Sequence, residues 1–344
     1  MSKKITFHDL ARVAKVSPAT VSRVAAGNPT VDPAIRRRVR DAAERLGLDF
    51  EERRNEKSRI IAFLLANRDV LHSFQARILL GAEKYCSLHN WELLFMSYHY
   101  SASVPRDSLH LPQLLSGRTN ARAVILGGTN SANLIQAFRE REIPFAVLGN
   151  NVVGAWQPAE CDVVSSDDVQ GAYDATTHLI AKGHSRIAYI GNLDFPWFAR
   201  AAQGYKRALD QAGLAHRLVD LRSDSAELGY LGTKTLLGEK DPVTAIFAGS
   251  DQVAAGVYNA LREADISVPG EFSVVGFNDT QGEFFHPALS TVREFPEELG
   301  RHLAEFVLRR LQNPRLPPQN VTIPTRLVSR DSVAVPTAMP KVLA

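Results

Sequence analysis

The chain is poor in cysteine and has no long apolar run, and each of these absences excludes a class of protein. Cys86 and Cys161 are its only cysteines, so there is neither a disulfide framework nor a CxxC metal or redox pair. The longest apolar stretches, such as IIAFLLA from Ile60, have the length of a strand and are too short to cross a bilayer. No apolar segment follows the basic start MSKKITFHDL, which predicts a cytoplasmic protein without a secretory signal.

Motifs that carry catalytic chemistry are missing as well. The sequence has no GxGxxG after a strand, no GxxxxGK[ST] phosphate loop and no GxSxG elbow. Its ten histidines form no HExxH motif or other close metal spacing. The sequence therefore predicts a protein that is not an enzyme and that carries no metal or cofactor.

Charge is distributed unevenly along the chain. The formal net charge of the whole is +3. Residues 1–48 hold ten basic and four acidic residues, a net charge of +6, which leaves −3 for the remainder. A basic head on a mildly acidic body predicts a polyanionic partner for the head, with a solvated basic face as the alternative.

The head (residues 1–48) carries the start signals of three helices. Thr6 and Asp9 have the spacing of a capping box, and an apolar stripe follows them. A Ser-Pro pair at residue 17 and an Asp-Pro pair at residue 32 start two further helices. Only about three residues separate the first helix from the second, and this short turn predicts a helix-turn-helix whose second helix enters the major groove. A three-helix bundle for protein contacts is the alternative.

The string ITFHDLARVAKVSPATVSRVAAGNPTVDPAIRRRVRDAAERLGL resembles the DNA-binding head of the LacI/GalR family of bacterial transcription regulators, with S-x-x-T-V-S-R-V as its most specific part. The sequence departs from the family at Lys15, where Gly is usual. The resemblance implies that the base-reading residues are Pro18, Ala19 and Arg23. The implied contacts to the DNA backbone are Thr6, Ser17, Thr20, Ser22 and Thr30.

The body (residues 60–335) alternates strand-like and helix-like segments. The expected buried strands are 60–66, 91–98, 122–128, 145–150, 186–192, 244–250 and 272–279. The expected helices are 74–89, 131–141, 168–182, 200–212 and 251–264. Repeated βα units predict the α/β class with doubly wound parallel sheets, which bind ligands at the carboxyl ends of their strands.

The body extends the same resemblance. VVSSDDVQGAYDATTHLIAKGHSRIAYIGN and AIFAGSDQVAAGVYNALREADISVPGEFSVVGFNDT match family segments. The implied fold is periplasmic-binding-protein-like, with two subdomains around an effector cleft. The implied limits are 60–160 with 292–320 for one subdomain, and 161–291 with 321–335 for the other. The expected effector-binding residues are Phe74, Asn150, Trp197, Arg200, Asp251 and Asn278.

Two positions depart from the family in the predicted pocket. Ala201 stands where the family has the Arg of R-x-x-G-[FY], with Arg200 one residue early, and Asp224 replaces an aromatic residue that stacks on the ligand. The linker, residues 49–59, mixes acidic and basic residues and lacks the Pro-Asn pair and leucine wedge of the family. We therefore expect it to bend DNA little.

These features together predict a repressor that binds a roughly palindromic double-stranded DNA operator as a homodimer. A sugar or a similar polar metabolite in the cleft would control it, and no membrane contact is expected. Two alternatives are a sugar-metabolising enzyme fused to a helix-turn-helix and an effector-free architectural DNA-binding protein. Only the first alternative predicts turnover, and the second predicts no ligand.

Overall fold

The structure is a computed structural model that describes residues 6–25, 28, 30–46, 59–68, 72–115 and 121–336. The head contains α1 (Phe7–Ala14), α2 (Pro18–Ala25) and α3 (Pro33–Arg45), as the start signals predict. Leu10, Val21 and Val39 are fully buried between these helices. Of the predicted linker, only residue 59 lies inside the described residues.

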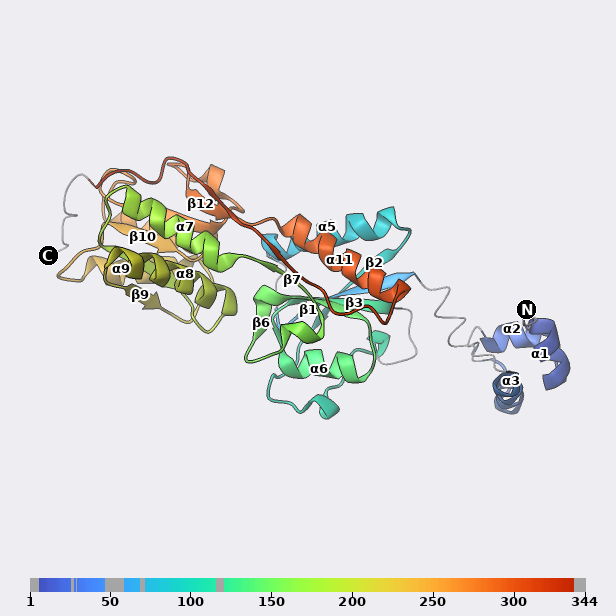
Figure 1. Cartoon of the computed structure of the whole chain (residues 1–344). Coiled ribbons are helices and arrows are strands. Elements are labelled where there is room, and N and C mark those ends of the chain that lie inside the picture. Colours follow the sequence, from blue (N-terminus) through green and yellow to red (C-terminus); the bar gives the residue numbers. More distant parts are fainter. Residues whose placement is uncertain are drawn as a thin grey trace.

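The N-terminal subdomain is built on a six-stranded parallel sheet of order β13-β7-β5-β3-β1-β2, and Figure 1 shows α5 and α11 on one side of it and α6 on the other. Two helices, α5 and α11, pack together on one face, and α6 packs on the other. The strands are β1 (Ile60–Ala66), β2 (Glu92–Tyr98), β3 (Ala121–Gly128), β5 (Phe145–Leu148), β7 (Asp162–Ser166) and β13 (Asn320–Ile323). The helices are α5 (Ser73–Leu88), α6 (Ala132–Glu140) and α11 (Pro296–Gln312), and a two-stranded ribbon pairs β4 (Asn130–Ser131) with β6 (Val152–Val153).

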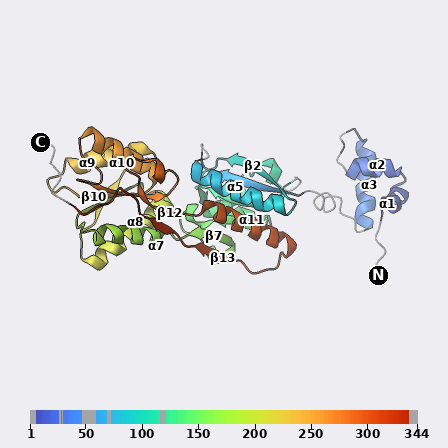
Figure 2. The same ribbon diagram turned by 90° about the horizontal axis from the view of Figure 1, so that it is seen from above.

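The C-terminal subdomain has a second six-stranded sheet, of order β14-β12-β11-β10-β8-β9, in which only β14 runs antiparallel to its neighbour. Figure 2 shows α9 and α10 on one side of this sheet and α7 and α8 on the other. The strands are β8 (Ile187–Gly191), β9 (Arg217–Asp220), β10 (Ala245–Ala248), β11 (Ser273–Asn278), β12 (Ser290–Arg293) and β14 (Arg326–Val328). The helices are α7 (Asp168–Ala181), α8 (Pro196–Ala212), α9 (Ala226–Leu237) and α10 (Asp251–Glu263).

The predicted α/β class with a helix-turn-helix head is confirmed, and the sheet pairings refine the limits of the subdomains. The chain crosses between the sheets three times, after β7, after β12 and after β13. The predicted limits, which the family resemblance implied, placed β7 and residues 321–323 of β13 with the second sheet and divided β12 between the two subdomains, whereas β7 and β13 pair in the first sheet and all of β12 pairs in the second. Backbone pairing of β7 with β5 and of β12 with β11 decides the assignment.

Several elements lie outside the predicted pattern. α8 begins at Pro196 rather than at residue 200, because proline at the first helical position is favourable there. α9 and α11 were not predicted, although both have buried apolar faces. Within the described part of the chain, no helix combines the length and hydropathy needed to cross a membrane.

Candidate functional site

The polar residues predicted for the DNA-binding surface also build the ends of the head helices. Thr6 Oγ1 accepts from the Asp9 amide while Asp9 Oδ2 accepts from the Thr6 amide, so the predicted capping box is present. Ser17 Oγ accepts from the Thr20 amide at 3.0 Å and caps α2. The amide and hydroxyl of Thr30 both donate to Asn28 Oδ1. Each of these side chains is thus held in one orientation at the head surface.

The outer face of α2 carries the predicted base-reading residues. Pro18, Ala19 and Arg23 are exposed, whereas Val21 and Val24 are buried against α1 and α3. Ser22 is exposed as well, and Thr20 is half-buried. This arrangement leaves one rigid helix face with an arginine and small side chains toward solvent.

A side chain of α3 hydrogen-bonds to the turn between α1 and α2. The sequence analysis did not predict this contact. Lys15 adopts the left-handed conformation, with φ 52° and ψ 50°, as expected for a position where Gly is usual. Arg38 Nη2 donates to the carbonyl oxygens of Ala14 and Lys15 at 2.8 and 3.0 Å. These two bonds offset part of the strain of a non-glycine residue there, which is on the order of 1 kcal/mol.

A cavity lies between the two subdomains of the body, at the carboxyl ends of the strands. Four of the six predicted effector-binding residues line it, namely Phe74, Asn150, Trp197 and Asn278. Asp224, noted above as a departure in the predicted pocket, and Asn151 line it too, as do four residues that the sequence did not indicate, Arg68, Gln75, Asp168 and Glu294. The strand-end rule therefore located the cavity but not its full wall.

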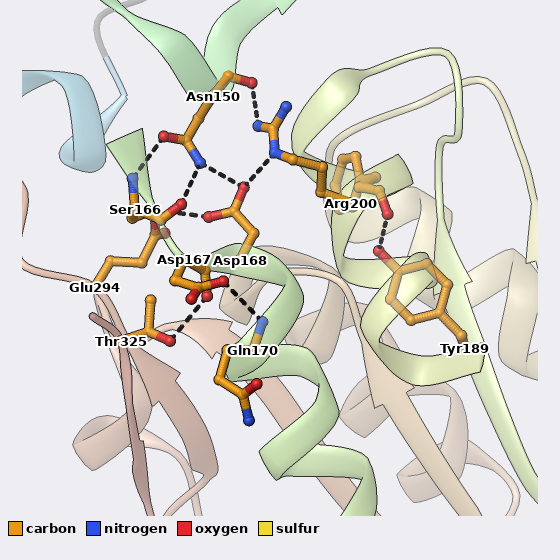
Figure 3. A network of polar contacts seen from close by, with 10 residues as sticks. Asn150, Ser166, Asp167, Asp168, Gln170, Tyr189, Arg200, Glu294 and Thr325 are labelled. Atoms are coloured by element: carbon orange, nitrogen blue, oxygen red, sulfur yellow. Dashed lines mark hydrogen bonds and ion pairs between the residues drawn. The ribbon is translucent and has the colours of Figure 1, made fainter. Parts of the chain in front are cut away.

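Asn150 and Arg200 belong to a hydrogen-bond network at the cavity floor (Figure 3). Asn150 Oδ1 accepts from the Ser166 amide at 2.7 Å, and Asn150 Nδ2 donates to Asp168 Oδ2 at 2.7 Å. Arg200 Nε donates to the same carboxylate at 3.0 Å, and Arg200 Nη2 donates to the Asn150 carbonyl. The Asn150 amide and the Arg200 guanidinium are therefore committed to holding the floor together.

Asp251 is placed differently from the prediction, because it does not belong to the cavity wall. Its side chain is buried at the start of α10, where Thr291 Oγ1 donates to Oδ1 at 2.6 Å and the Gln281 amide donates to Oδ2 at 3.2 Å. Burial raises the pKa of Asp251 to about 6. Its carboxyl group thus ties the start of α10 to β12 and to the loop after β11.

A contact across the cavity explains the unusual Asp224. Arg68, which follows β1 in the N-terminal subdomain, donates from Nη1 to Asp224 Oδ2 at 2.6 Å. The Arg68 guanidinium carbon also lies 4.6 Å from the centroid of Trp197, whose ring stacks on Phe195. An arginine thus occupies the aromatic face of Trp197, and Asp224 supplies its counter-charge.

Two buried amide groups in the cavity wall lack hydrogen-bond partners within the described structure. Gln75 Oε1 and Asn151 Nδ2 are the atoms concerned, and the residues are 4% and 3% exposed. A buried polar atom without a partner costs about 1–3 kcal/mol. A ligand that offers a donor to Gln75 and an acceptor to Asn151 would remove this cost.

The described residues hold no cluster of His, Cys, Asp and Glu suited to a metal ion. Cys86 and Cys161 are buried, and burial raises the pKa of each thiol to about 12. Neither cysteine contributes to the cavity wall. The cavity chemistry is therefore that of amides, hydroxyls and carboxyl groups.

Comparisons with known proteins identify both parts of the chain. The family model "Bacterial regulatory proteins, lacI family" matches residues 6–48, and a periplasmic binding protein-like domain matches residues 176–333. The regulator GalR of Escherichia coli K12 is 32% identical over 342 residues, which cover 96% of each chain. The chain belongs to the LacI family of bacterial regulatory proteins.

Other LacI-type relatives agree with this assignment over nearly the whole chain. Catabolite control protein A of Priestia megaterium is 29% identical, covering 95% of this chain and 99% of its own. The solved complex of the regulator CelR with cellobiose superposes with a TM-score of 0.71 at 27% identity, covering 96% of this chain and 100% of that one. This LacI family member is thus a DNA-binding transcriptional regulator with a periplasmic-binding-protein-like body.

Proposed function

We propose that this LacI family member is a cytoplasmic repressor that binds an operator as a homodimer and responds to a small polar effector. The observation that carries the proposal is the cavity between the subdomains, where Gln75 and Asn151 present buried polar atoms with no partner among the described residues. A cavity prepared in this way is suited to a ligand that shifts the subdomains relative to each other. The protein is not an enzyme in this proposal.

The effector is an uncharged, hydroxyl-rich molecule. Both arginines at the cavity already have carboxylate partners, since Arg68 pairs with Asp224 and Arg200 pairs with Asp168. A phosphate or carboxylate on the ligand would have to displace one of these ion pairs. Hydroxyl groups, in contrast, both donate and accept and so match Gln75 and Asn151. Phe74 adds an apolar surface for the ring of a sugar.

A thermal-shift screen of the full chain tests this assignment. Its members are neutral sugars and polyols, including ribose and cellobiose, together with sugar phosphates and nucleobases. We expect a rise in Tm with a neutral sugar or polyol and none with the corresponding phosphate. A hit that is chemically converted in a turnover assay would favour the fused-enzyme alternative, and no hit at all would favour the architectural one.

Asn278 is the proposed effector contact that we select for substitution. It ends β11 with a positive φ of 85° and lines the cavity. We expect Asn278→Ala to weaken binding of the best thermal-shift ligand by about 1–3 kcal/mol, because a buried hydrogen-bond partner is lost. Isothermal titration checks this, with the exposed Asn259→Ala as the control. Equal affinities in the two variants would place the ligand elsewhere.

Dimerisation is proposed through the outer face of α5 and β2. Leu80 and Leu88 of α5 are 43% and 80% exposed, and Phe95 of the edge strand β2 is 42% exposed. Phe95 lies on the α5 side of the sheet, because its ring stacks on Phe63, which packs in the same core cluster as α5. Large apolar side chains exposed together on one face mark an interaction surface, and a second copy is the partner that joins two heads.

The head, residues 1–48, is the proposed operator-reading unit. Arg23 on the exposed face of α2 is expected to read guanine, with Pro18 and Ala19 against neighbouring bases. The proposed backbone contacts are Thr6, Ser17, Thr20, Ser22 and Thr30.

We expect Arg23→Ala to cost about 1–3 kcal/mol of operator affinity and to relax the preference at one base position in each half-site. Competition gel shifts with single-base operator variants measure both effects. Arg12→Ala, in which an exposed arginine of α1 is removed, is the control. An equal loss of affinity for every sequence would make Arg23 a phosphate contact and this assignment wrong.

A further inference from the structure

Two carboxyl groups meet at a single hydroxyl on the cavity floor. Ser166 Oγ lies 2.6 Å from Asp168 Oδ1 and 2.6 Å from Glu294 Oε1 (Figure 3). A serine hydroxyl has one proton and therefore donates to only one of the two oxygens. The other contact becomes a hydrogen bond when the second carboxyl group carries a proton and donates it to Ser166. The geometry thus points to one bound proton shared by this group of three residues.

The surroundings indicate that Glu294 holds that proton. Asp168 Oδ2 accepts from Asn150 Nδ2 at 2.7 Å and from Arg200 Nε at 3.0 Å, so the charge of Asp168 is matched by a guanidinium. Glu294 is 7% exposed and is subject to the negative charges of Asp168 and Asp251, while Arg200, which would favour its charged form, already pairs with Asp168. Burial, with the negative charge of Asp168 added, raises the pKa of Glu294 to about 8.

The residues of this network come from both subdomains and from the crossings between them. Ser166 and Glu294 stand at the ends of β7 and β12, where the chain leaves each sheet. Asn150 belongs to the N-terminal subdomain and Arg200 to α8 of the C-terminal one, and the two are joined directly. A change in the charge of Glu294 therefore alters contacts at the hinge between the subdomains rather than contacts within one subdomain.

We propose that the body contains a proton-linked hinge, in which a proton held between Glu294 and Asp168 through Ser166 keeps the subdomains together at the cavity floor. Loss of the proton places two carboxylates on one hydroxyl, so one hydrogen bond is lost and the two negative charges repel. The subdomains then separate in mildly alkaline solution. The hinge itself does not depend on the proposed function. Only one consequence of the hinge rests on that function, namely that effector affinity falls as the proton is lost.

Trp197 provides a reporter at the cavity without any ligand. The chain has three tryptophans, so Trp91→Phe combined with Trp156→Phe leaves Trp197 as the only one. Its indole lies under Arg68 of the opposite subdomain, and this contact changes when the subdomains separate. We expect its fluorescence in the full chain to change with a midpoint near pH 8.

The same background with Glu294→Gln should show no such transition, because the amide keeps a donor for Ser166 and has no proton to lose in this range. Glu283→Gln, at an exposed carboxylate of the C-terminal subdomain, should keep it. A transition that persists in Glu294→Gln, or its absence from the parent chain, would overturn the proposal. Neither outcome depends on whether an effector is found.

Stability measurements provide a second, independent test. A carboxyl group with a folded-state pKa near 8 and an unfolded-state pKa near 4.5 stabilises the fold fully below about pH 4.5, and this stability is lost as the pH rises toward 8. The folding equilibrium constant of Glu294→Gln relative to the parent should therefore rise about tenfold per pH unit from about pH 5 to pH 8 and then level off. Urea unfolding measures this ratio, and a ratio independent of pH would contradict the proposal.

Discussion

Phe95→Asp should convert the chain into a monomer and lower its operator affinity at least about 100-fold. A charged side chain in the middle of the proposed dimer face cannot be buried there without a large desolvation cost. A monomer binds each half-site separately. It therefore loses the effective-concentration advantage of two joined heads, which raises affinity by about 10²–10⁴-fold in such systems. Sedimentation equilibrium and gel shifts on the same preparation measure both effects.

The control for this prediction is Val335→Asp, which places the same charge at an exposed apolar position near the C-terminal end of the described chain, 63% exposed in the structure. It should remain dimeric with unchanged operator affinity. Because Phe95 is 42% exposed, we expect its replacement to leave the fold intact, and circular dichroism of the variant checks this. A Phe95→Asp variant that stays dimeric would move the interface away from α5 and β2.

Arg200→Ala should destabilise the body by about 3–5 kcal/mol. The Asp168 side chain is 2% exposed, and Arg200 is its ion-pair partner at 3.0 Å. Removal of one partner leaves a buried carboxylate without its counter-charge, which costs far more than the loss of an exposed ion pair. Because Arg200 also binds the Asn150 carbonyl, the variant weakens the join between the subdomains. Urea unfolding of the full chain provides the measurement.

Two further variants separate this charge effect from loss of packing. Arg222→Ala removes an arginine that is 91% exposed and 3.8 Å from Asp194, and it should change the stability by less than about 1 kcal/mol. Adding Asp168→Asn to Arg200→Ala removes the unpaired charge and should recover part of the stability. If the double variant is as unstable as the sum of the two single variants, the cost lies in packing rather than in charge.

The local signals of the sequence were sufficient for the head and for the repeated βα units. Capping side chains and helix-starting prolines act within four residues, so α1, α2 and α3 begin where predicted. Continuous apolar runs likewise predicted the central strands of both sheets. The strands at the crossings were harder, because β7 and β12 are short, end in polar residues and are defined by pairing with distant partners.

The site was predictable in position and only partly in composition. Strand ends brought Asn278 and Asn150 to the cavity, as the topology requires. Arg68 was missed because its partner Asp224 lies 156 residues away and no local pattern joins them. Asp251 was assigned to the ligand, whereas the fold brings Thr291 from a neighbouring strand and uses the carboxyl group internally.

The most direct test of the account is the affinity of the full chain for its own operator, with and without the cavity ligand. Operator selection from a random duplex pool supplies the DNA, and the best neutral sugar or polyol of the thermal-shift screen supplies the ligand. The account predicts a two-fold symmetric operator, an affinity that the ligand changes about 5–150-fold in the wild type, and a smaller change in Asn278→Ala at a ligand concentration near the wild-type Kd. An operator affinity that is the same with and without a ligand proven to occupy the cavity would contradict it.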